Sequence, residues 1–101
     1  MEKIKAYVGF AKKSRSIVYG VDDIVRSQAS KIIVVSQSLG KSSLNQVKKF
    51  AESKNIELFV IYESTMTAIT SENVKAFSIT DVGLASACAK ILKSEVGGKI
   101  E

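Results

Sequence analysis

The sequence contains no proline, histidine or tryptophan, and it has a single cysteine, Cys88. Without histidine there is no Ser–His–Asp triad, no imidazole ligand for a metal and no imidazole proton shuttle. One cysteine allows neither an intramolecular disulfide nor a cysteine-pair metal motif. No apolar stretch reaches the ~18 residues of a membrane span, and the charged start of the chain does not resemble a secretory signal. We therefore expect a cytoplasmic, non-catalytic protein that contacts no membrane and needs no metal or cofactor.

The 101 residues are 46% hydrophobic and 25% charged. This length suits one domain and leaves no room for a second core. The hydrophobic content argues against a disordered chain. We place the single domain at residues 1–95. Residues 96–101 include the pair Gly97-Gly98 and are predicted to form a flexible tail.

Positive charge is concentrated in the first half of the chain. Residues 1–49 hold ten lysines and arginines against three acidic residues, whereas residues 50–101 hold five against seven, and the net charge of the whole chain is +5. Such an uneven distribution predicts a basic surface that faces a polyanion, most often nucleic acid. At this point the alternative is a solvated surface that is basic without a partner.

Four apolar segments are predicted to be β-strands. Residues 32–35 and 58–61 are short, continuous apolar runs, which are typical of central strands covered on both faces. Residues 74–79 are rich in valine, phenylalanine and isoleucine, and residues 16–19 form a weaker fourth strand.

Helical patterns fill the segments between these strands. Residues 2–13 repeat apolar positions at i, i+3, i+4 and i+7, which predicts an amphipathic helix. Ser43 and Gln46 have the spacing of a capping box and predict a helix to about residue 53, while Asp81 is a suitable N-cap for the last helix. Shorter helices are expected at residues 21–27 and 65–69. The alternation predicts an α/β fold, a three-layer α/β/α sandwich with a mixed sheet of about four strands.

Two short features could carry chemistry, but neither meets the requirements of its class. Residues 40–42, Gly-Lys-Ser, follow a predicted strand as in phosphate-binding loops, but the glycine needed five residues earlier is Val35. A single phosphate at that helix start stays open, although a flexible glycine before a helix is the simpler interpretation. Cys88 lies on the apolar stripe of the last helix with no histidine to activate it, which favours a packing role.

Longer segments of the sequence are more informative. From Gly9 the chain reads Gly-Phe-Ala-Lys-Lys, followed by a small-residue turn, an apolar strand and Gly20, and then a helix and the strand at residues 31–35. From Thr80 it reads Thr-Asp-Val-Gly-Leu-Ala. This combination, with matching element order over residues 4–93, resembles the ribosomal L-seven-Ae/L-thirty-e family, in particular its short bacterial members. The resemblance implies binding of kink-turn RNA, a sharply bent internal loop with tandem G·A pairs.

The resemblance also implies particular RNA contacts at the second helix. The family motif Gly-x-Asn-Glu-x-x-Lys matches from Gly20, and it places Asp22, Asp23 and Arg26 at the positions of Asn, Glu and Lys. A carboxylate accepts hydrogen bonds from the N–H groups of a guanine edge, and a basic side chain donates to base acceptors or to phosphate.

Further contacts are implied on both sides of this motif. The basic side chains Lys12, Lys13 and Arg15 are expected to contact phosphates. An apolar loop before the last strand would meet an extruded nucleotide, and in this chain it corresponds to Ile69 and Thr70. The expected partner is structured RNA, ribosomal or from another ribonucleoprotein.

The acidic pair Asp22-Asp23 motivates an alternative function. Asp22 lacks the amide donor of the family's Asn, and Asp23 is one methylene shorter than Glu. Because fold does not settle function, the same scaffold could instead be a protein-interaction module that has lost RNA binding.

Overall fold

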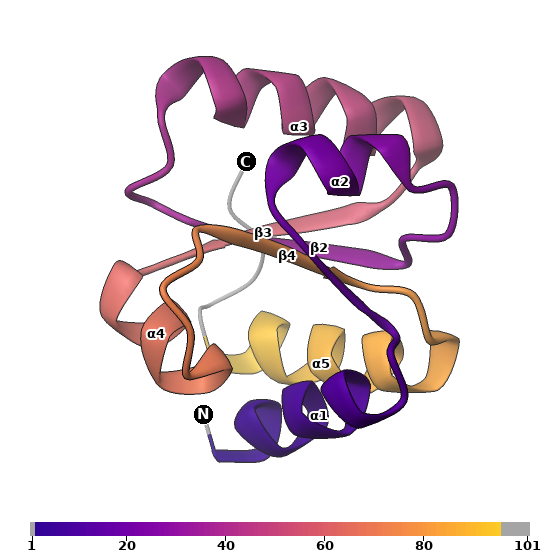
Figure 1. Cartoon of the computed structure of the whole chain (residues 1–101), viewed down its shortest axis with the longest axis vertical. Coiled ribbons are helices and arrows are strands. Elements are labelled where there is room, and N and C mark those ends of the chain that lie inside the picture. Colours follow the sequence, from indigo (N-terminus) through magenta and orange to yellow (C-terminus); the bar gives the residue numbers. More distant parts are fainter. Residues whose placement is uncertain (1, 96–101) are drawn as a thin grey trace.

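The computed structural model describes residues 2–95 (Figure 1). Within this range the chain forms, in order, α1 (Glu2–Lys13), β1 (Ile17–Tyr19), α2 (Val21–Arg26), β2 (Ile32–Ser36), α3 (Lys41–Lys54), β3 (Glu57–Ile61), α4 (Glu63–Thr70), β4 (Ala76–Ile79) and α5 (Val82–Glu95). Each predicted helix and strand is present with shifted ends, except that residues 2–13 are helical as predicted. The tail predicted at residues 96–101 lies outside the described residues.

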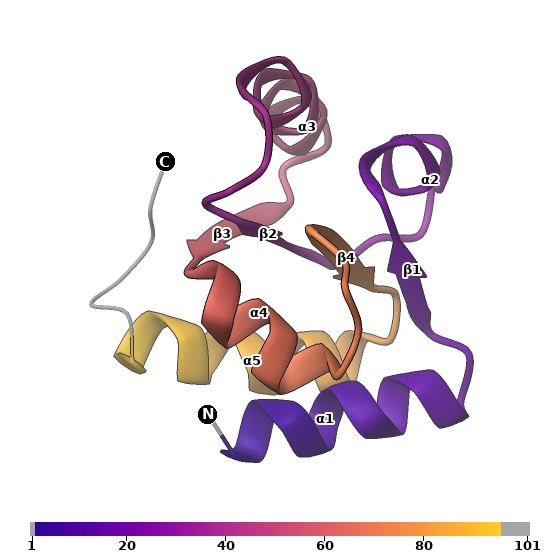
Figure 2. The ribbon, with the colours of Figure 1, turned by 60° about the vertical axis from the view of Figure 1, so that its left-hand side comes forward.

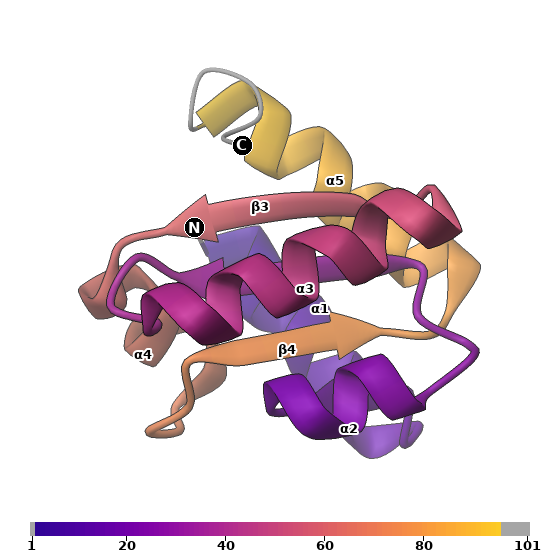
Figure 3. The same cartoon turned by 90° about the horizontal axis from the view of Figure 1, so that it is seen from above.

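The four strands form one sheet in the order β1-β4-β2-β3. Strands β2 and β3 are parallel, whereas β4 pairs antiparallel with both β1 and β2, so the sheet is mixed. Helices α2 and α3 cover one face, and α1, α4 and α5 cover the other (Figures 1 and 3). The predicted α/β/α sandwich with a mixed four-stranded sheet is therefore confirmed.

The two faces of the sheet carry separate apolar clusters because side chains alternate along each strand. In β2, Ile33 and Val35 point to the cluster under α2 and α3, and Ile32 and Val34 point to the larger cluster under α1, α4 and α5. All five residues of β2 are buried. This is the burial expected of a continuous apolar strand covered on both sides.

Strand β3 differs from its prediction. Its apolar run predicted a central strand, but β3 lies at an edge of the sheet. Leu58 and Val60 are only partly buried, although Phe59 is fully enclosed. An apolar run reports coverage of the two faces of a strand, and it carries no information about whether a neighbour pairs with the outer edge.

The beginnings of two helices give opposite outcomes. Asp81 caps α5 as predicted, because its Oδ1 accepts a hydrogen bond of 2.9 Å from the backbone N–H of Leu84. Helix α3 instead begins at Lys41, two residues before the expected cap Ser43, and its N-cap Gly40 provides no side-chain hydrogen bond. The predicted capping box is therefore wrong, since Ser43 lies within the first turn of the helix.

Candidate nucleic-acid interface

The residues predicted to bind RNA lie around β1, which is the edge strand opposite β3. The C-terminal end of α1 leads into β1, and α2 follows it directly (Figure 2). The backbone N–H of Gly20 donates a hydrogen bond of 3.0 Å to the carbonyl of Ala76, which holds the start of α2 beside the loop that joins α4 to β4. We call this region the β1-edge site; its residues are Lys12, Lys13, Arg15, Tyr19, Gly20, Asp22, Asp23, Arg26 and Glu72.

The turn between α1 and β1 is held by backbone hydrogen bonds around Arg15. The N–H of Ser16 donates to the carbonyl of Ala11 at 2.8 Å, and Arg15 adopts a left-handed conformation with φ 58°. This is the arrangement of a Schellman motif, in which glycine is the usual left-handed residue. The exposed Arg15 therefore occupies a backbone conformation that L-residues adopt at a cost of about 1–2 kcal/mol.

Lys12 is already engaged within the protein. Its Nζ donates a hydrogen bond to the carbonyl of Thr70 and lies 3.4 Å from Oε2 of Glu72. These contacts join the end of α1 to the loop after α4, some 60 residues later in the chain. Lys12 therefore fixes the position of that loop, and part of its charge is offset by Glu72.

Tyr19 was not among the predicted residues, yet it lies at the centre of this contact. Burial raises the pKa of its hydroxyl, and the nearby charge of Lys12 opposes that rise. The hydroxyl is enclosed and has no hydrogen-bond partner within residues 2–94. The enclosed hydroxyl of Tyr19 could not be predicted from the sequence, because the local pattern indicates only that Tyr19 belongs to a short apolar strand.

Gly20 is required by backbone conformation. Its φ is +87°, a value that L side chains rarely adopt, while a Cβ built on it meets no atom within 4 Å. Space is therefore not the constraint at this position. The unusual φ turns the chain from β1 into α2 and points Asp22 and Asp23, in the first turn of α2, into solvent.

Arg26 and Asp23 form an exposed ion pair on α2. The Nη1 of Arg26 lies 3.3 Å from Oδ1 of Asp23, three residues earlier on the helix. Both residues border a shallow groove of about 470 Å³ that is also lined by Ile17, Val18 and Tyr19 of β1. The groove provides a surface on which the guanidinium and the carboxylate lie side by side.

The structure contradicts the predicted roles of Ile69 and Thr70. They lie in the last turn of α4, where Ile69 is 2% exposed and Thr70 is fully buried. Thr70 uses its hydroxyl to bond the carbonyl of Met66 and the N–H of Glu72. Neither side chain can reach a nucleotide, because an apolar segment that completes a helix packs into the core. The exposed residues of this loop are Ser71, Glu72, Asn73 and Lys75.

The charge at the β1-edge site is close to balanced. Lys12, Lys13, Arg15 and Arg26 supply four positive charges, whereas Asp22, Asp23 and Glu72 supply three negative ones. The other lysines of the basic half lie elsewhere: Lys3 and Lys5 at the start of α1, Lys31 just before β2, and Lys41, Lys48 and Lys49 on α3. The excess of charge seen in the first half of the sequence is therefore spread over several surfaces.

The remaining features considered from sequence fall outside this site. Cys88 is 1% exposed in the core, and burial raises the pKa of its thiol to about 11, which agrees with a packing role. Lys41 and Ser42 border an open groove along α3 that is also lined by Asn45, Gln46 and Lys49. Among residues 2–95, no three His, Cys, Asp or Glu side chains are grouped so that they could hold a metal ion, and none of the helices is long and apolar enough to span a bilayer.

Comparison with known proteins supports the fold alone. The sequence matches no protein-family profile and no curated protein. Among solved structures, a protein of unknown function from Bacillus halodurans C superposes with a TM-score of 0.80. The match covers 90% of this chain and 97% of that one, at 14% sequence identity. At this identity the similarity concerns the arrangement of helices and strands, and it carries no information about activity.

Proposed function

We propose that this protein binds structured RNA of the kink-turn type at the β1-edge site, without catalysis, as a ribosomal or other ribonucleoprotein component. The observation that carries the proposal is the meeting of three separate segments at one edge of the sheet. The end of α1, the start of α2 and the loop after α4 are joined by the Lys12–Thr70 and Gly20–Ala76 hydrogen bonds. The resemblance to the L-seven-Ae/L-thirty-e family points to the same segments.

The roles of the side chains follow from their chemistry. Lys13 and Arg15 are exposed and form no ion pair within residues 2–94, so they are available to contact phosphates. Asp22 and Asp23 are exposed acceptors suited to the N–H groups of guanine. Lys12 acts mainly as a positioning residue, because its ammonium group already holds the loop at Thr70 and Glu72.

The direct test compares two RNA oligonucleotides in a fluorescence anisotropy titration. One contains a kink-turn with tandem G·A pairs, and the other has those pairs replaced by Watson–Crick pairs. We expect tighter binding of the kink-turn RNA and a steep loss of affinity as salt is raised, because phosphate contacts release counterions. Equal binding of the two RNAs would remove the kink-turn specificity, and an affinity independent of salt would refute the phosphate contacts.

Variants test the location of the site. We expect Lys13→Ala and Arg26→Ala each to weaken RNA binding and to reduce the salt dependence, by about one phosphate contact for Lys13. Lys49→Ala is the matched control, since Lys49 is an exposed lysine on α3. If the control lowers affinity as much as the two variants do, the RNA does not bind at the β1-edge site.

A second candidate function is protein interaction on the same scaffold. It is favoured by the two ion pairs, Lys12–Glu72 and Arg26–Asp23, which offset half of the positive charges at the β1-edge site. The discriminating experiment is a pull-down of the tagged protein with and without ribonuclease. Recovery of one stoichiometric protein partner after nuclease treatment, together with no binding of either RNA, would favour this function.

A further inference from the structure

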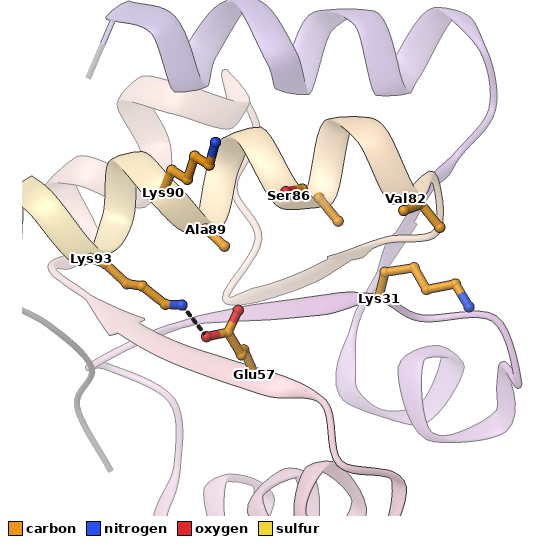
Figure 4. Close-up of a pocket in the computed structure, with 8 residues that line it drawn as sticks. Lys31, Glu57, Val82, Ser86, Ala89, Lys90 and Lys93 are labelled. Atoms are coloured by element: carbon orange, nitrogen blue, oxygen red, sulfur yellow. Dashed lines mark ion pairs between the residues drawn. The ribbon is translucent and has the colours of Figure 1, made fainter.

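A second groove lies beside β3, at the opposite edge of the sheet from the β1-edge site. It is formed by α5 and by the beginnings of β2 and β3, and has a volume of about 410 Å³ (Figure 4). We call it the α5 groove. The groove is lined by Lys31, Glu57, Val82, Ser86, Lys90 and Lys93, and by two alanines of α5, Ala85 and Ala89.

The shape of the groove follows from the spacing of side chains on α5. Ala85, Ser86 and Ala89 are small residues on the side of the helix that lines the groove. They leave a hollow where longer side chains would fill the space. At one end lies Val82, which is 66% exposed, so the groove contains apolar surface that no part of residues 2–94 covers.

The rim of the groove is positively charged. Lys93 is paired with Glu57 at 2.7 Å at one end, and Lys31 lies near Val82 at the other (Figure 4). Lys31 and Lys90 are exposed and form no ion pair with the carboxylates of residues 2–94. Three lysines and one glutamate therefore line the groove. Its exposed apolar surface is mainly that of Val82, because Ala85 and Ala89 are only 4% and 7% exposed.

We propose that the α5 groove binds an acidic segment of a partner protein, with an apolar side chain on Val82 and the alanines and carboxylates at Lys31 and Lys90. Charge complementarity identifies the occupant, because Lys31 and Lys90, which pair with no carboxylate of residues 2–94, lie beside the apolar surface. RNA fits less well. The lining contains no aromatic side chain on which a base could stack. The outer edge of β3 lies beside the groove and pairs with no other strand of residues 2–95. Its backbone N–H and C=O groups can therefore bond the backbone of the peptide.

The test uses a synthetic peptide in which one leucine is flanked on each side by two glutamates. The isotopically labelled full-length protein is titrated with this peptide, and amide chemical shifts are followed by NMR. The control peptide has the same length with glutamine in place of glutamate. We expect saturable shifts at Lys31 and at residues 82–93 with the acidic peptide, and none with the control.

Substitutions at exposed positions separate the groove from general electrostatics. Lys90→Glu replaces an attraction by a repulsion, and we expect it to weaken peptide binding about fivefold. Val82→Ser removes apolar contact and is expected to weaken binding about threefold. Lys49→Glu makes the same charge change on α3, on the other face of the sheet, and is expected to leave peptide affinity within twofold of the wild type.

Several outcomes overturn the proposal. These are shifts spread over the lysines of α3, an equal loss of affinity with Lys49→Glu and Lys90→Glu, and no saturable binding. Amide chemical-shift changes at the α5 groove on titration with the kink-turn RNA would show that the groove belongs to an RNA surface. Changes there that depend on protein concentration in the absence of peptide would show self-association. The proposal is independent of RNA binding at the β1-edge site: Lys90→Glu is expected to change RNA affinity no more than Lys49→Glu does.

Discussion

Arg15 allows the backbone and the charge of the β1-edge site to be tested separately. Its φ of 58° places it in the left-handed region, where the Cβ of an L-residue costs about 1–2 kcal/mol. Glycine has no such cost, although its greater freedom in the unfolded chain reduces the gain by about 0.4–1 kcal/mol. The net difference between glycine and alanine at this position is therefore about 1 kcal/mol in favour of glycine.

The comparison is made between Arg15→Gly and Arg15→Ala. Both variants remove the same charge, and with it the favourable interaction of a cation with the C-terminal end of α1. Only Arg15→Gly relieves the backbone. We expect Arg15→Gly to be more stable than Arg15→Ala by about 1 kcal/mol, which corresponds to about 4–8 °C in Tm for a domain of this size. Thermal unfolding followed by circular dichroism measures this difference.

RNA binding provides the second measurement on the same pair. If Arg15 contributes only its charge, both variants lose the same affinity and the same amount of salt dependence, about one phosphate contact. Equal Tm values for Arg15→Gly and Arg15→Ala would refute the left-handed turn. Weaker binding by Arg15→Gly than by Arg15→Ala would show instead that a fixed turn, and not only the charge, is needed to present the site.

Three further predictions concern Asp23, the buried serine pair and Cys88. Asp23→Asn removes the negative charge that lies 3.3 Å from Arg26. Titration with the kink-turn RNA is expected to show weaker binding, because an amide oxygen accepts hydrogen bonds from the N–H groups of guanine less strongly than a carboxylate does. Stronger binding would mean that Asp23 only neutralises Arg26. Ser30 donates a hydrogen bond of 2.9 Å to Ser78 in the interior. Urea unfolding is therefore expected to show that Ser30→Ala lowers the free energy of unfolding by about 1–2 kcal/mol. The double variant Ser30→Ala/Ser78→Ala is expected to lower it by less than the sum of the two single variants. Burial raises the pKa of Cys88 from 9.0 to about 11, so the folded state holds the thiol proton at a pH where the unfolded state has lost it. The free energy of unfolding is therefore expected to fall between about pH 9 and pH 11 by up to about 3 kcal/mol. Cys88→Ala, although less stable throughout, should show a shallower fall, and an identical slope would exclude the thiol as its cause.

The fold was predictable because each element carries its own local pattern. The period of apolar residues in α1 and the continuous apolar run of β2 each identify one element from adjacent residues. Alternation of helices with strands then limits the architecture to a layered sandwich. The position of β3 at an edge was not predictable in the same way, because it depends on which strands become neighbours after folding. Hydrogen bonding along an edge leaves no mark on the side-chain pattern of a strand that is covered on both faces.

In the candidate site, too, the features that depend on adjacent residues were predictable, and those that depend on the folded arrangement were not. Gly20 and the exposed pair Asp22-Asp23 follow from a local motif, and the structure gives Gly20 the positive φ that only glycine adopts readily. Ile69 and Thr70 were misplaced because a short apolar segment can either complete a helix or form an exposed loop. Burial decided between the two. Their side chains complete the core under α4, and the polar residues that follow them form the surface.

The two ion pairs at the β1-edge site show why charge counted along a sequence overestimates the charge of a surface. Arg26 and Asp23 are three residues apart on one helix, so their pairing is visible in the sequence. Lys12 and Glu72 are brought together only by the fold. A phosphate that approaches Lys12 competes with Glu72 and with the carbonyl of Thr70, whereas a phosphate at Lys13 or Arg15 displaces only water and counterions. The affinity of this surface for RNA should therefore depend more on Lys13 and Arg15 than on Lys12, although Lys12 is the cation most firmly fixed in place.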